Sequence, residues 1–194
     1  CSNGHDICSF GYCLTDEKFK IIKKEDIVIN PESKIVLSKK GEVAKIHLAY
    51  SQEYFNKQNP FVFYYPKIKK LLTDRKHVLF GHAIQSDFSY LNIACRRYNL
   101  PAIEMEGYDT QKLHHLIYKT PHIESLEKIV EELEFANDFL YHNSSEDAHA
   151  TMLVAKRIFE EYELDFATFK DKYSDCLVKN VCPKPKEKNI LRNQ

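Results

Sequence analysis

The chain contains little glycine and proline, with 5 and 7 residues of the 194. This scarcity excludes a fibrous or linker-like protein. An excess of one charge is also absent, because 28 basic side chains balance 28 acidic ones, which excludes a strongly basic, histone-like coat. No apolar run approaches the ~18 residues needed to cross a bilayer. A signal peptide has a cationic segment followed by an apolar stretch, and the sequence shows no such pattern. We therefore expect no membrane association.

The composition is that of a globular domain, since 43% of the residues are hydrophobic. A chain of this length suits one domain and can bury roughly 70% of its unfolded surface. The six cysteines form no CxxC pair, and several lie in apolar segments. Scattered thiols of this kind are typical of core residues in a reducing cytoplasm rather than of disulfides or a zinc site. We expect a cytoplasmic protein.

Hydrophobic patterning predicts a mixed α/β fold without internal repeats. We expect one packed domain over residues 1–174 and a partly disordered tail over 175–194. Helix-period patterns are clearest in the second half of the chain. The expected strands are 7–14, 19–22, 26–29, 78–80 and a short one closed by Tyr108. The expected helices are 43–55, 66–73 (opened by Pro66), 87–98, 110–118, 125–134, 146–162 and 166–173.

Two aspartates begin helix faces that we expect to point inward. Asp87 precedes Leu91 and Ala94, and Asp147 precedes Thr151 and Val154. An ionised carboxylate buried without a partner costs several kcal/mol or more. Either each aspartate caps its own helix, where the dipole favours an anion by about 0.3–1 kcal/mol, or both bind a divalent cation.

A histidine lies just before the second of these helices. His142 opens the polar loop 142–146, which leads directly to Asp147. A neutral imidazole there can take a proton from a water held by the carboxylate below it. The alternative is an ordinary surface histidine.

These motifs together resemble the DEDDh 3′–5′ exonucleases, the proofreading-subunit-like branch of the ribonuclease H-like superfamily. The segment 81–88, Gly-His-Ala-Ile-Gln-Ser-Asp-Phe, is similar to their second motif, and His142 with Asp147 and Ala148 is similar to their third. The segments 108–110 and 125–126 match the aspartate–threonine and serine–leucine pairs between them. Four motifs in the same order make the resemblance specific.

The sequence departs from the family at two places. Ala83 stands where an asparagine commonly follows the motif histidine. The first motif, an Asp-x-Glu on the first strand, is absent, and we expect it immediately upstream of Cys1. The 194 residues alone are then expected to bind metal poorly and to cleave little.

The resemblance implies a mixed five-stranded sheet with helices on both faces, and hydrolysis of the terminal phosphodiester bond at a 3′ end, which releases nucleoside monophosphates, with two Mg²⁺ or Mn²⁺ ions. Asp147 would bind the ion that activates water, Asp87 would bind the second ion, and His142 would be the general base. Single-stranded or frayed nucleic acid is the implied partner, with a polymerase or another nucleic-acid enzyme as a further partner. Contacts to the terminal nucleotide are expected from Cys1, Ser2, His82 and Phe88.

Other functions remain open at this point. The chain is compatible with a catalytically inactive, exonuclease-like module that only binds nucleic acid or another protein. It is also compatible with a metal phosphohydrolase for small nucleotides, or with an exported protein acylated at Cys1.

Overall fold

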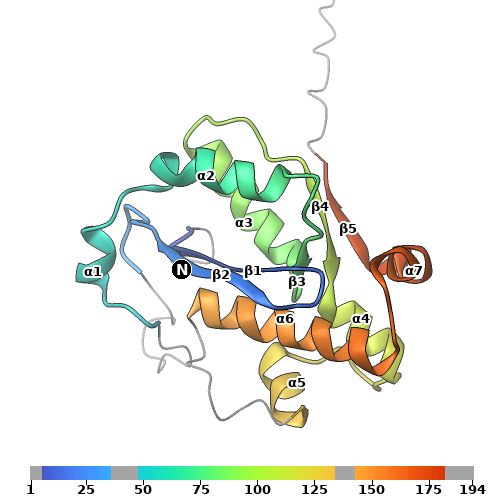
Figure 1. The fold of residues 1–194 in the computed structure, drawn as a ribbon. Coiled ribbons are helices and arrows are strands. Elements are labelled where there is room, and N and C mark those ends of the chain that lie inside the picture. Colours follow the sequence, from blue (N-terminus) through green and yellow to red (C-terminus); the bar gives the residue numbers. More distant parts are fainter. Residues whose placement is uncertain (1–5, 36–47, 134–142, 182–194) are drawn as a thin grey trace, which may run out of the picture.

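The computed structural model describes residues 6–35, 48–133 and 143–181 (Figure 1). Helices make up about half of these ranges and lie mainly in the second half of the chain. The helices are α1 (Gln52–Asn56), α2 (Phe61–Thr73), α3 (Ile84–Arg97), α4 (Thr110–Tyr118), α5 (Leu126–Glu132), α6 (Ser144–Glu161) and α7 (Phe166–Lys172). The strands are β1 (Ser9–Thr15), β2 (Ile21–Val28), β3 (Phe80–Gly81), β4 (Met105–Asp109) and β5 (Leu177–Asn180).

The strands form two separate sheets in the described ranges. Strands β1 and β2 make an antiparallel hairpin, and its turn is held by Asp16, whose Oδ1 accepts from the amides of Lys18 and Lys20. In the second sheet, β4 lies between β3, which is parallel to it, and β5, which is antiparallel. The mixed α/β class is confirmed, but a two-stranded and a three-stranded sheet replace the single five-stranded sheet that we expected.

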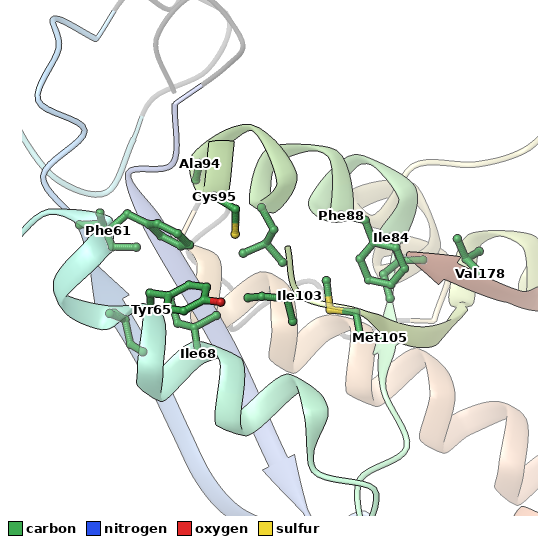
Figure 2. Close-up of a cluster of buried hydrophobic side chains, with 13 residues drawn as sticks. Phe61, Tyr65, Ile68, Ile84, Phe88, Ala94, Cys95, Ile103, Met105 and Val178 are labelled. Carbon is green, nitrogen blue, oxygen red and sulfur yellow. The ribbon is translucent and has the colours of Figure 1, made fainter. Parts of the chain in front are cut away.

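Helices cover the strands on both sides (Figure 1). Helices α2 and α3 pack against β2, β4 and β5 through one cluster of buried side chains, which Figure 2 shows. Helices α4, α5, α6 and α7 surround a second cluster, in which Phe159, Phe169 and Tyr108 stack edge-on or tilted against one another. Helix α3 contributes to the first cluster and α6 to the second. The site described below lies at the first turns of these two helices.

Several predicted elements differ from the observed ones for local reasons. The two short strands predicted at 19–22 and 26–29 are one strand, β2. Its central residues 23–25 are polar and break the apolar pattern, but the strand continues through them because the hairpin is half-exposed there. Helix α2 begins at Phe61, a turn earlier than predicted, so Pro66 lies inside it rather than in its first turn. Strand β5 was not predicted, and it extends the packed chain beyond the boundary that we expected at residue 174.

The structure also bears on the cysteines and on the expected lack of a membrane span. Cys13, Cys95 and Cys176 are free thiols, but Cys8 is disulfide-bonded. This corrects the expectation that the cysteines form no disulfide. Among the helices in the described ranges, none combines the length and the apolar composition that spanning a bilayer requires.

Candidate active site

Asp87 is placed by a tight turn between β3 and α3. Gly81 ends β3, and Ala83 adopts a left-handed conformation with φ of 53° before the helix begins. The amide of Ser86 donates to the Ala83 carbonyl at 2.9 Å, which closes the first turn. Asp87 follows in that turn and is exposed, whereas Phe88 and Leu91 point into the core. The expectation that Asp87 faces the interior is therefore wrong, because the core-facing stripe of α3 runs through Ile84, Phe88 and Leu91, and Asp87 lies beside it.

Asp147 is placed by the start of α6. Asn143 caps this helix, and its Oδ1 accepts from the amides of Ser145 and Glu146 at 3.0 and 3.3 Å. The Asp147 amide donates to the Asn143 carbonyl at 2.9 Å. Asp147 is half-buried. The backbone at Asp147 is therefore positioned by an asparagine cap at the start of the helix.

The charges of these two aspartates act on each other. The pKa of Asp87 is raised to about 6, first because protein atoms surround the carboxylate and exclude part of its water, then because Asp109 and Asp147 are close enough to repel a second negative charge. Because Asp87 is also partly open to solvent, water screens these repulsions to some degree. Two carboxylates far apart in the sequence thus share one electrostatic environment.

Asp109 has a structural role beside this pair. It ends β4, is only 3% exposed, and caps α4 by accepting from the Gln111 amide at 3.0 Å. The same oxygen, Oδ1, accepts from the Ala83 amide at 3.1 Å. Asp109 therefore ties the turn before α3 to the start of α4, and its charge also raises the pKa of Asp87.

His82 is held by the same group of elements. Its Nδ1 lies 3.2 Å from Thr110 Oγ1, and its Nε2 lies 3.1 Å from the Glu124 carbonyl oxygen. Burial lowers the pKa of His82, which favours the neutral ring, and Nε2 can donate to the carbonyl oxygen. His82 bridges the motif turn to α4 and to the residues before α5, and its contact with a nucleotide stays a prediction.

The remaining predicted site residues are either buried or outside the described ranges. Phe88 is 2% exposed and packs beside Ile84 and Met105 (Figure 2), so its predicted contact with a nucleotide would require the ring to leave the core. His142, Cys1 and Ser2 lie outside the described residues.

Sequence reasoning missed Asp26 of β2. Its Oδ1 accepts from Ser144 Oγ at 2.6 Å, and the buried Oδ2 lacks a hydrogen-bond partner among the described residues. The contact fixes the first residue of α6, the helix that carries Asp147, to the hairpin. No sequence signal marked Asp26, because a polar residue in a half-exposed strand is ordinary.

The donor set fits a hard divalent cation. Asp87 and Asp147 offer carboxylate oxygens, the ligands that Mg²⁺ and Mn²⁺ prefer. A cation between them would also relieve the repulsion that raises the pKa of Asp87. Cys95 lies on α3 but is eight residues beyond Asp87 and buried in the core, and α6 carries no cysteine to favour a softer metal.

Comparison with protein families agrees with this arrangement. Residues 19–158 match the family described as DEDDh_C, "DNA polymerase III subunit epsilon-like, C-terminal domain". The chain belongs to this DEDDh-type 3′–5′ exonuclease family. The matched residues contain Asp87, Asp109 and Asp147, and this confirms the resemblance seen in the motifs.

Solved structures with the same fold include exonucleases. A structure described as "3'-end specific recognition of histone mRNA stem-loop by 3'-exonuclease" has 17% identity and a TM-score of 0.62, with 76% of this chain and 68% of that one covered. A "full-length 3'-exonuclease" has 14% identity and a TM-score of 0.60, with 83% of this chain and 64% of that one covered.

A third structure covers a more similar length. The "nuclease domain of 3'hExo, a DEDDh family member, bound to rAMP" has 18% identity and a TM-score of 0.50, with 83% of this chain and 95% of that one covered. A comparison with curated proteins found no match. At these identities the structures show a shared ribonuclease H-like fold.

Proposed function

We propose that this chain is the core of a metal-dependent 3′–5′ exonuclease that releases nucleoside monophosphates from single-stranded or frayed nucleic acid. One observation carries the proposal: the aspartates of two DEDDh motifs, Asp87 and Asp147, lie within electrostatic reach of each other at the starts of α3 and α6. Membership of the family supports the reaction class. The ligands named in the related structures, a histone mRNA stem-loop and the nucleotide rAMP, support nucleic acid as the ligand.

In this proposal Asp87 and Asp147 hold two Mg²⁺ or Mn²⁺ ions. Divalent ions supply, when bound, activation of the attacking water and stabilisation of the leaving oxygen. Asp109 keeps the turn before α3 in place through the Ala83 amide, and Asn143 keeps the first turn of α6 in place. The two carboxylates are thereby oriented before any ligand arrives.

His142 is proposed as the general base that takes the proton of the attacking water. Cys1, Ser2, His82 and Phe88 remain the proposed contacts for the terminal nucleotide. The proposed domain includes the Asp-x-Glu pair of the first motif, which the 194 residues do not contain. The free thiols support the cytoplasmic location that we propose, whereas the disulfide of Cys8 counts against it. The comparisons give no support for a polymerase partner.

The test follows the stepwise shortening of 5′-labelled single-stranded RNA and DNA from the 3′ end by the full-length natural protein in Mn²⁺, and identifies the released mononucleotides by chromatography. We expect Asp147→Asn and His142→Ala each to lower the rate by about 10² or more. The matched control is Asp171→Asn, which removes an exposed aspartate on α7 and should leave the rate unchanged.

Two results would contradict the proposal. The first is near-normal cleavage by Asp147→Asn. The second is tight binding of oligonucleotides by the natural protein without any cleavage, which would instead indicate the inactive binding module.

A further inference from the structure

Three potential metal ligands gather away from Asp87 and Asp147. His114 lies on α4, Glu124 lies two residues before the first residue of α5, and Glu132 ends α5. Each offers one ligand atom, and these atoms all lie within 4.8 Å of one another. His114 is 4% exposed and Glu124 8% exposed, whereas Glu132 is open to solvent. Two buried ligands and one at the surface make a site that an ion can enter.

The two buried side chains have unsatisfied atoms that face each other. His114 Nδ1 and Glu124 Oε2 are buried and have no hydrogen-bond partner in the described part of the chain. They lie 3.6 Å apart, which is too long for a normal N–H···O hydrogen bond and too short for a bridging water, which would hold them about 4.5 Å apart. Leaving such atoms buried and unpaired is unfavourable, and a bound ion would remove this penalty.

The separation suits two ligands of one zinc ion. Zinc is bound by imidazole nitrogen and carboxylate oxygen at about 2.1 Å in tetrahedral geometry, which sets neighbouring ligand atoms about 3.4 Å apart. A histidine ligand among carboxylates favours zinc over Mg²⁺, which prefers oxygen. We propose that His114, Glu124 and Glu132 bind a zinc ion that fastens α4 to α5, with a fourth position open to water.

Lys128 accounts for the stability of the cluster without an ion. Its ammonium contacts Glu124 Oε1 and lies 3.5 Å from Glu132 Oε1. The lysine leaves Glu124 Oε2 free, and its side chain is 56% exposed, so it can swing away into solvent. Two carboxylates against one ammonium still leave an excess of one negative charge for a cation to neutralise.

The ion would also brace a contact to the second DEDDh motif. The Glu124 carbonyl oxygen lies 3.1 Å from His82 Nε2 and accepts from Gln111 Nε2 at 2.8 Å. Fixing the Glu124 side chain therefore restrains the carbonyl that holds His82. The proposed zinc site does not depend on cleavage, since none of its ligands is Asp87 or Asp147.

The experiment titrates the EDTA-stripped chain with ZnCl₂ alone and records stoichiometry by calorimetry and the melting temperature. Asp87→Asn with Asp147→Asn serves as the background, so that the exonuclease site contributes no zinc binding. We expect one zinc ion per chain and a higher melting temperature. Co²⁺ in place of zinc should give the visible absorption of a tetrahedral nitrogen–oxygen site.

Single changes then test the ligands. His114→Ala and Glu132→Gln should each weaken zinc binding by about 10-fold or more, and Glu132→Gln, at an exposed position, should not disturb folding. His115→Ala is the matched control: His115 follows on α4 but bonds Thr120 instead, so zinc affinity should not change. Lys128→Met should raise the affinity, because it removes the competing cation.

The proposal is overturned if the background variant takes up no zinc. It is overturned equally if Glu132→Gln, like the control His115→Ala, binds zinc as tightly as the background variant. Absence of nuclease activity in the natural protein, with zinc binding intact, would contradict only the proposed function.

Discussion

At the scale of single residues, neighbours decide what each acidic side chain does. Asp87, Asp109 and Asp147 are the same residue type, yet Asp109 is a buried helix cap and Asp87 is an exposed carboxylate with a raised pKa. Asp109 accepts two backbone amides and so serves as a structural cap. The pKa of Asp87 is raised by the partial loss of water around its carboxylate and by the charges of Asp109 and Asp147, and carboxylates perturbed in this way are typical of functional sites.

Glu25 shows the opposite shift and predicts a pH dependence of stability. Hydrogen bonds from Lys23, then Lys67 and Tyr12, lower its pKa from 4.5 to about 2. A depressed folded-state pKa stabilises the protein above the unfolded value, and this stabilisation is lost as the pH falls from about 4.5 to about 2. Discounted for solvent screening, we expect Glu25→Gln to cost about 1 kcal/mol at pH 7.

The measurement is urea unfolding of the chain and of Glu25→Gln between pH 7 and pH 3. The difference in unfolding free energy should shrink below about pH 4.5. A difference that stays constant over this range would show that Glu25 acts through packing rather than charge.

The backbone conformation at Ala83 predicts that a substitution there can stabilise the chain. Its φ of 53° is left-handed, a conformation that asparagine tolerates better than alanine, and asparagine is the residue that DEDDh motifs commonly carry there. Ala83→Asn should stabilise the chain by about 0.5 kcal/mol, as measured by chemical unfolding. Ala83→Val is the opposing control and should destabilise it, because a β-branched side chain fits this conformation poorly. Equal effects of the two substitutions would rule out strain at this position.

At the scale of elements, the close approach of β1 and α6 sets the position of the third motif. A Cβ built on Gly11 would lie 2.0 Å from the Ser144 carbonyl carbon, so only glycine lets the strand reach the start of the helix. Asp26 on the neighbouring strand bonds the same residue, Ser144. The hairpin therefore serves as the platform on which Asp147 is held.

Gly11→Ala should consequently destabilise the chain by about 3 kcal/mol or more, because backbone rather than a flexible side chain must move. Thermal unfolding followed by circular dichroism measures the effect. Ser9→Ala, two residues earlier on β1, should change the melting temperature little. A tolerated alanine at position 11 would show that α6 does not start against the strand.

At the scale of the whole molecule, β5 joins parts that are distant in the sequence. Asn180 is 7% exposed. Its Nδ2 donates to the Ile103 carbonyl at 2.8 Å, and its amide exchanges hydrogen bonds with that of Asn92 on α3. The end of the described chain thus fixes α3, the helix that carries Asp87, to the three-stranded sheet.

Asn180→Ala should cost about 2 kcal/mol, because it leaves the buried Ile103 carbonyl and the Asn92 amide without partners. Urea unfolding measures the loss. Lys179→Ala is the control at the next position, where the exposed ion pair with Glu106 should contribute well under 1 kcal/mol. Similar losses for both would mean that the amide pair adds nothing beyond surface contacts.

The sequence by itself determined the local features of this protein. Helix periodicity located α3, α4 and α6, the helix predicted at 125–134 is α5 with Ser125 as its cap, and ordered motifs identified the family. These signals are local, since helical spacing, caps and motifs each act over a few neighbouring residues.

Only the tertiary structure decided the features that depend on contacts between distant residues. The short strand β5 forms because β4 offers it a ladder, and its four residues carry no periodic signal of their own. The exposure of Asp87, the role of Asp26 and the pairing of His114 with Glu124 likewise arise from residues that meet only after packing. Burial and electrostatic coupling are properties of that packing, so no spacing along the chain could have revealed them.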